Sequence, residues 1–448
     1  MAGGNWLTQP RIRLTVLIFS HAVICCVSLF YVAGYKYPGS VTPEPFHILY
    51  DPARLHLAVI AVAAFTPISF LFAFSRFSFG YFVGFYFYTM ILGYLWLNSF
   101  SDLNYDHLLG GFSAAASTVA FLVPALLISS PIRQIYTLSA RALENVLQFI
   151  LLLAVVTIVA GASYDFRLVS LENIYDFRDK LGSPTLVKYL VGITSNALLP
   201  FAFACFVMRR DYWRAGAVLF LLLLFYPITL SKLSFFTSAW LVFFAILSKL
   251  FQARTAVVVS LLGPILAGIV LNLLSERQAI SYFYTINFRM IAIPSNAMDV
   301  YNDYFSKHDL THFCQISVLK QIINCPYQEQ LSIVMQKAYD LGNFNASLFA
   351  TEGIASVGML FAPISVFACG LVIALGNRLS AGLPPRFILM SSAILPQVLL
   401  NVPLTTVLLT HGAGLLFLLW YITPRTIFEQ KIVEQTDRLS RPERSKRS

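Results

Sequence analysis

The chain contains twelve apolar runs, each long enough, or nearly long enough, to cross a lipid bilayer. A spanning helix needs about 20 apolar residues. Only 12% of the residues are charged and 58% are hydrophobic, whereas about 25% of the residues of a soluble domain are charged. The sequence therefore predicts an all-α polytopic membrane protein with about twelve transmembrane helices. We expect them at 13–34, 55–75, 78–99, 111–131, 143–162, 188–208, 215–231, 233–250, 255–274, 352–376, 387–409 and 410–423.

Lys and Arg residues predict the orientation of these spans. If the N-terminus is cytoplasmic, nineteen of the 31 basic residues fall in inner loops or in the tail, as expected for N-in and C-in topology. The net charge of +10 is thus explained without a nucleic-acid partner, because no basic stripe is formed. The first run follows Arg11 and Arg13 and is too long for a signal-peptide core. Residues 1–423 are expected to form one membrane domain, followed by a charged cytoplasmic tail at 424–448.

Two polar segments are expected outside the membrane, at 163–189 and 275–350. The second is too long for a simple connection. It contains Cys314 and Cys325, which would form a disulfide in an oxidising compartment. Since no spacing of Cys and His suits a metal ion, we expect neither a metal nor another cofactor.

Basic residues gather where these outer segments meet the membrane. Arginine binds phosphate oxygens through two parallel hydrogen bonds, and the diphosphate of a lipid-linked substrate would lie at this depth. Arg167 could instead form an ion pair with Asp165, which stands two residues before it, and would then not bind phosphate. The candidates for substrate binding are Arg167, Arg178, Lys188, Arg277 and Arg289.

Two further residues are candidates because of their place at span ends. Lys232 lies in the turn expected between two short spans, where an ammonium near lipid is costly; it could also extend to the headgroups. Glu352 is the last acid before a span, within Thr351-Glu-Gly-Ile-Ala-Ser-Val-Gly358. Its carboxylate could accept the proton of a sugar hydroxyl, hold an Arg in place, or remain a solvated helix-end group.

Five short segments stand out: Ile174-Tyr-Asp-Phe-Arg178, Ser231-Lys-Leu-Ser234, Asn287-Phe-Arg-Met290, Tyr301 to Asp309 and Thr351 to Gly358. They resemble segments of bacterial O-antigen polymerases of the Wzy type and of related polymerases of oligosaccharide repeat units. The number of spans and the two outer segments also fit that family. One family spacing is absent, because Arg178 is followed by Gly192 after fourteen residues instead of eleven.

The resemblance implies a metal-independent glycosyltransferase of the bacterial inner membrane. Its donor would be a glycan on undecaprenyl diphosphate and its acceptor the sugar of a new lipid-linked repeat unit, in a groove shared with membrane lipid. A chain-length regulator would be a further partner. O-antigen ligases share the architecture and remain an alternative. A flippase is another alternative, for which polar groups at mid-membrane and broken helices would be typical.

Overall fold

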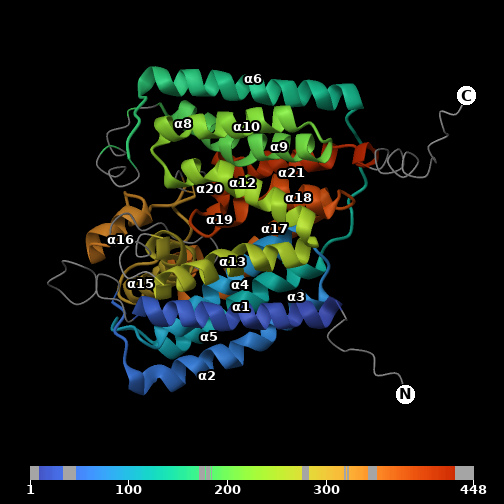
Figure 1. Ribbon diagram of the computed structural model, residues 1–448. Coiled ribbons are helices and arrows are strands. Elements are labelled where there is room, and N and C mark those ends of the chain that lie inside the picture. Colours follow the sequence, from blue (N-terminus) through green and yellow to red (C-terminus); the bar gives the residue numbers. More distant parts are fainter. Residues whose placement is uncertain are drawn as a thin grey trace, which may run out of the picture. The chain divides into compact units, whose positions relative to one another are not determined.

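The computed structural model describes residues 10–33, 47–170, 177, 182, 184–274, 282–316, 319, 322–341 and 351–428. These residues are mostly helical, and their β structure is an isolated antiparallel bridge between Ile48 and Ser101. Among them, ten helices are long and apolar enough to cross a membrane, or up to eleven if a bent pair counts as one span. The prediction of an all-α polytopic membrane protein is therefore confirmed (Figure 1).

The first ten expected spans each correspond to a helix or helical series, but the last two are replaced by four short helices. Pro396 and Pro403 lie in this region and lack the N–H group that a continuous helix needs. Gly412 has a φ of 78° and precedes the last helix. The described residues thus contain ten or eleven spans where the sequence predicted twelve. The short helices are α18 (Pro385–Ser391), α19 (Leu395–Leu399), α20 (Leu404–Thr410) and α21 (Ala413–Ile422), with a 60° bend between the last two.

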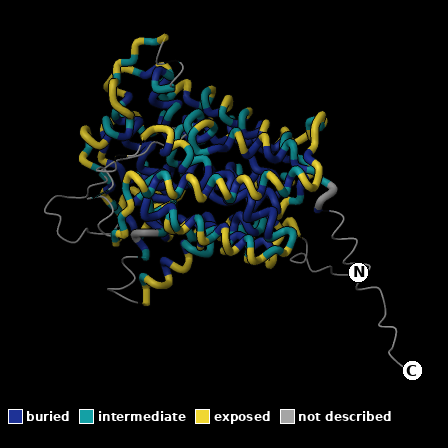
Figure 2. Tube along the Cα trace, turned by 90° about the horizontal axis from the view of Figure 1, so that it is seen from above, coloured by how far each residue is buried: buried dark blue, intermediate teal, exposed yellow. Residues whose placement is uncertain are grey.

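By its internal contacts the chain divides into two compact units. Unit 1 comprises Met1–Ser129, Lys249–Asn377 and Leu395–Val407, and unit 2 comprises Ser130–Ser248, Arg378–Ile394 and Leu408–Ser448. Buried positions lie toward the interior and exposed positions toward the periphery (Figure 2). The helices of unit 1 that precede its second part are α1 (Pro10–Ala33), η2 (Pro52–Arg54), α2 (Leu55–Phe65), η3 (Thr66–Ser69), α3 (Phe70–Phe74), α4 (Phe79–Asn98) and α5 (His107–Leu127).

Helix α4 is the centre of unit 1. Every residue from Phe79 to Leu97 is buried, and α1, α2, α5 and α13 (Ala253–Leu274) all pack against it. It contains several Tyr and Gly residues, and its mean hydropathy is the lowest among the described spans. It is also the most deeply buried of them. A helix that is enclosed by other helices does not need a lipid-facing apolar surface. Gly93 permits close packing, because a Cβ there would overlap the Oγ atom of Ser295.

Part of the predicted outer segment 275–350 packs inside unit 1. The π-helix η5 (Tyr284–Ala292) continues directly into α15 (Ile293–Phe305), and both contact α4. The Asn287 amide donates hydrogen bonds to the Oγ of Ser28 in α1 and to the carbonyl of Ile265 in α13, at 3.0 and 2.8 Å. This polar helix therefore lies alongside spanning helices and not only beyond their ends. The segment also contains α16 (Leu331–Tyr339).

Helix α17 (Thr351–Ser380) is interrupted at Gly358, where φ is 77° and ψ is 168°. Residues before the break fold back on those after it, because a Cβ at Gly353 would lie 3.2 Å from the carbonyl oxygen of Ala362. The carbonyls of Ala355 and Ser356, just before the break, accept hydrogen bonds from the backbone N–H groups of Thr311 and His312, at 2.8 and 3.1 Å. A short helix thus enters unit 1, and the long outer segment holds its end.

Unit 2 contains the remaining helices. The π-helix η4 interrupts one of its spans, and α6 contacts this span along three of its parts. Glu144 of α6 receives hydrogen bonds from Arg209, at 2.8 Å, and from Arg214. The helices are α6 (Ala140–Tyr164), α8 (Thr185–Ile193), η4 (Thr194–Leu198), α9 (Leu199–Met208), α10 (Tyr212–Leu224), α11 (Tyr226–Thr229) and α12 (Lys232–Leu250), followed by α18 and α21, with η7 (Arg425–Phe428) last.

Candidate functional site

Glu352 is the second residue of the short helix that precedes the break at Gly358. The side chain is partly buried. The backbone N–H group of Leu404 donates a hydrogen bond to its carboxylate, and the phenol of Tyr301 on α15 lies within electrostatic range. The hydroxyl of Tyr301 is buried and has no hydrogen-bond partner among the described residues. The sequence offered a solvated helix-end Glu as an alternative, and the structure instead places this carboxylate within the packed part of unit 1.

A second carboxylate, Asp299 of α15, is buried against α4 and the loop that joins α4 to α5. Its Oδ2 atom accepts a hydrogen bond of 2.5 Å from Ser101, and its Oδ1 atom accepts one from the phenol of Tyr105. The Tyr105 hydroxyl also lies 3.0 Å from that of Tyr94, to which Asn302 donates at 2.9 Å. We call these five residues the Asp299 network. It joins three segments of unit 1 through side chains alone.

Burial raises the pKa of Asp299 to about 7. The hydrogen bonds from Ser101 and Tyr105 lower this pKa, but by less than burial raises it. The nearby carboxylates of Asp303 and Asp102 raise it further. Burial also raises the pKa of the Tyr105 phenol, so this group remains a hydrogen-bond donor. Because the donors are hydroxyl groups that can reverse, the network can hold Asp299 in either protonation state.

The predicted cations of unit 1 are only partly described. Arg289 lies near the end of η5, and its side chain is exposed. It stands on the same continuous helix as Asp299 and Tyr301. Arg277 lies outside the described residues. Arg289 therefore shares one helix with the acid Asp299 and with Tyr301, the neighbour of Glu352, although it is exposed and they are buried.

Two of the predicted cations of unit 2, Arg167 and Lys232, lie at the corner between α11 and α12. Arg167 forms an ion pair with Asp165, at 2.7 Å, and its backbone N–H donates to the carbonyl of Pro227. This is the local pairing that the sequence offered as the alternative to phosphate binding. Lys232 is the first residue of α12 and partly buried, after a reversal at Leu230 where φ is 45°. Lys188 is exposed on α8. Arg178 lies outside the described residues.

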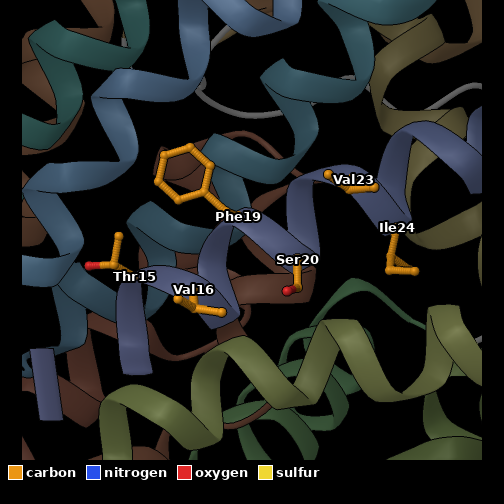
Figure 3. Close-up of a pocket in the computed structure, with 6 residues that line it drawn as sticks. All are labelled: Thr15, Val16, Phe19, Ser20, Val23 and Ile24. Atoms are coloured by element: carbon orange, nitrogen blue, oxygen red, sulfur yellow. The ribbon is translucent and has the colours of Figure 1, made fainter. Parts of the chain in front are cut away.

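The described residues contain no group of three or more His, Cys, Asp or Glu side chains that could hold a metal ion. The disulfide between Cys314 and Cys325, in contrast, is present, with the Cα atoms 5.3 Å apart. A groove of about 470 Å³ lies along α1 (Figure 3). It is lined by Thr15, Val16, Phe19, Ser20, Val23 and Ile24, and is mostly apolar. It includes none of the predicted site residues, and a lipid-facing helix would show such a surface.

The Asp299 network was not foreseen in the sequence, although its signal is present there. Ser295, Asp299 and Asn302 are spaced by four and three residues and therefore share one face of a helix. That face packs on α4, where Ser295 donates a hydrogen bond to the carbonyl of Met90 at 2.9 Å. A polar stripe normally faces water. The reason it is buried lies in its partners, Ser101 and Tyr105, which are distant in sequence.

Comparison of the chain with family models, curated proteins and solved structures finds no match.

Proposed function

We propose that the chain is a glycosyltransferase that polymerises oligosaccharide repeat units carried on undecaprenyl diphosphate at the outer face of a bacterial inner membrane. The observation that carries the proposal is Glu352, a carboxylate at the start of a helix that folds back into unit 1. The Leu404 N–H group holds it from one side. The unpaired hydroxyl of Tyr301 lies nearby and could bind a further polar group.

In the proposed reaction, the oxygen of an acceptor sugar hydroxyl attacks the anomeric carbon of the donor glycan. A new C–O bond forms, the bond from that carbon to the diphosphate breaks, and undecaprenyl diphosphate leaves. Glu352 takes the hydroxyl proton, as a general base. Arginine side chains at the membrane surface, among them Arg289, stabilise the negative charge of the leaving diphosphate.

The enzyme proposal is tested by chain extension with the purified full chain and lipid-linked repeat units from a strain in which this gene is deleted. We expect products with several repeat units, seen as a ladder on a gel. Glu352→Gln keeps the size and the Leu404 contact but removes the base, so we expect extension at least 100-fold slower. Unaltered units with the wild-type protein would refute the proposal, and an equally active Glu352→Gln would remove Glu352 from it. An O-antigen ligase would not lengthen these units.

A second candidate function, transport of lipid-linked glycans, is favoured by the interrupted helices. The break at Gly358 and the 60° bend between α20 and α21 resemble the discontinuous helices of transporters, which carry buried polar sites at such breaks. The two functions differ in a vesicle assay. A transporter moves fluorescent lipid-linked repeat units between leaflets without lengthening them, whereas the polymerase lengthens them in detergent, where no leaflets exist.

A further inference from the structure

Four aromatic rings meet on the part of unit 1 that includes the end of α15. The ring of Tyr304 is stacked on that of His308, with centroids 3.9 Å apart and planes inclined by 6°. The rings of Tyr327 and Tyr339 lie 6.2 and 6.4 Å from Tyr304. We call these four residues the aromatic cluster. They come from α15, the turn after it, the segment that follows Cys325 and α16.

The aromatic cluster is not a closed hydrophobic core. His308 is exposed, and the three tyrosines are each only partly buried. Hydrogen-bonding groups border the rings. Asp303 accepts from the Tyr339 hydroxyl at 2.6 Å and from the Lys307 ammonium at 2.5 Å, and the Lys307 side chain is 44% exposed. The exposed imidazole of His308 and the exposed part of Lys307 therefore lie beside three partly buried tyrosines.

Several contacts hold the cluster in place. Tyr327 stands two residues after Cys325, which is bonded to Cys314. Its hydroxyl donates to the carbonyl of Asp309 at 2.7 Å, and Gln315 donates to its carbonyl at 3.3 Å. Side chains fixed in advance lose little entropy when a ligand binds. The surface is thus arranged before any ligand arrives.

The chemistry of the surface selects one class of ligand. The carboxylates of Asp303 and Asp309 lie near the rings, together with the ammonium of Lys307, and these acids oppose a phosphate group. The charged groups equally oppose an acyl chain. A pyranose fits both features. Its C–H face packs on an aromatic ring, while its hydroxyl groups exchange hydrogen bonds with carboxylate, imidazole and ammonium groups.

We propose that the aromatic cluster binds one sugar residue of the lipid-linked glycan, by packing on the ring of Tyr304 or His308. This inference rests on the proposed function, since it assigns a subsite for the same substrate. It requires only that the glycan be held, and not that Tyr304 or His308 take part in bond formation. The chemistry stays with Glu352.

The test uses the full chain in detergent and the free oligosaccharide that mild acid releases from lipid-linked repeat units. Saturation-transfer NMR or calorimetry measures its binding. We expect the wild type and Glu352→Gln to bind it alike. We expect Tyr304→Ala and His308→Ala to bind at least tenfold more weakly, and Tyr304→Phe to bind within threefold of the wild type. His308 is exposed, so its variant tests the surface without disturbing the core. Tyr136→Ala, at an exposed tyrosine of unit 2, is the matched control.

The inference is overturned if the wild type does not bind the oligosaccharide, or if Tyr304→Ala and His308→Ala bind it as well as the wild type does. The latter result would leave the tyrosines as anchors at the headgroup level. These results are separate from the polymerase assay. Extension by a wild type that does not bind the free sugar would refute the subsite alone. If the wild type binds the oligosaccharide, the two Ala variants do not, and the wild type shows no chain extension, the subsite is supported and polymerisation is refuted.

Discussion

At the scale of single residues, Asp299 couples stability to pH. Its pKa is about 7 in the folded protein and about 4 in an unfolded chain. Between these values the folded state binds more protons, so the free energy of unfolding falls as the pH rises from about 4 to 7 and is level above. The loss is at most about 4 kcal/mol.

Asp299→Asn should remove this dependence, because the amide resembles the neutral acid. We expect the variant and the wild type to melt together at pH 4 and the variant to melt several degrees higher at pH 8, measured by thermal unfolding in detergent. Asp309→Asn, at an exposed carboxylate, is the control and should leave the pH dependence unchanged. Equal melting of wild type and Asp299→Asn at pH 8 would show that Asp299 is ionised without cost.

Arg289 gives a second test at this scale, within the proposed function. If its guanidinium stabilises the leaving diphosphate, Arg289→Ala should cost about 3–4 kcal/mol of transition-state stabilisation. Arg289→Lys should restore only part of the rate, because an ammonium does not offer the planar pair of donors. The measurement is the chain-extension rate at saturating acceptor. Equal rates for wild type and Arg289→Ala would place the diphosphate elsewhere.

At the scale of elements, the break in α17 depends on Gly358. Its φ of 77° and ψ of 168° lie in a region that is essentially restricted to glycine. Gly358→Ala should therefore cost about 1–3 kcal/mol, lower the melting temperature, and slow chain extension by moving Glu352. Gly263→Ala is the matched control, because its Cβ would enter open space in α13 and helix propensity favours Ala. Similar melting of the two variants would show that the backbone at 358 adapts.

The disulfide is a second element that can be removed. We expect the double variant Cys314→Ser/Cys325→Ser to loosen the loop between these positions and the segment with Tyr327 after it. A disulfide restricts the unfolded chain and so stabilises the folded state by about 2–4 kcal/mol. Limited proteolysis should cut the variant between these positions faster than the oxidised wild type. The spans should stay protected. An unchanged cleavage pattern would mean that the hydrogen bonds of Gln315 suffice to hold the loop.

The spans were predictable because a helix that crosses lipid needs about 20 consecutive apolar residues. The helix formed by η5 and α15 was not predictable in this way. Helix α6 is apolar and its expected and observed ranges nearly coincide. The helix through Asn287 and Asp299 is polar, so it was assigned to the outside. Its burial depends on partners such as Ser28 and Ser101, and a sequence pattern does not show such pairings. Glu352 was a candidate in the sequence because an acid before a span is visible there, whereas its hydrogen bond from the Leu404 N–H group was not predictable.

At the scale of the whole molecule, the proposals for both units require one topology. The charge pattern predicts that 163–189 and 275–350 lie outside the cytoplasm and that the loop before α6 lies inside. Exposed positions suitable for single cysteines are available on each side. Leu168 and Gln328 are exposed in the two outer segments, and Thr137 is exposed in the inner loop.

We expect a membrane-impermeant maleimide to label Leu168→Cys and Gln328→Cys in intact cells and Thr137→Cys only after the cells are opened. Of the native cysteines, four lie within helices expected to span and two are bonded to each other, so they should give little background. The wild type, labelled in parallel, measures that background. The proposed donor glycan and the oxidising compartment expected for the disulfide both require the external side. Labelling of Thr137→Cys in intact cells would therefore contradict the polymerase, the sugar subsite and the disulfide's environment together. If Leu168→Cys were labelled and Gln328→Cys were not, the two segments predicted to be external would lie on opposite sides of the membrane. Glu352 could then not act in the proposed reaction.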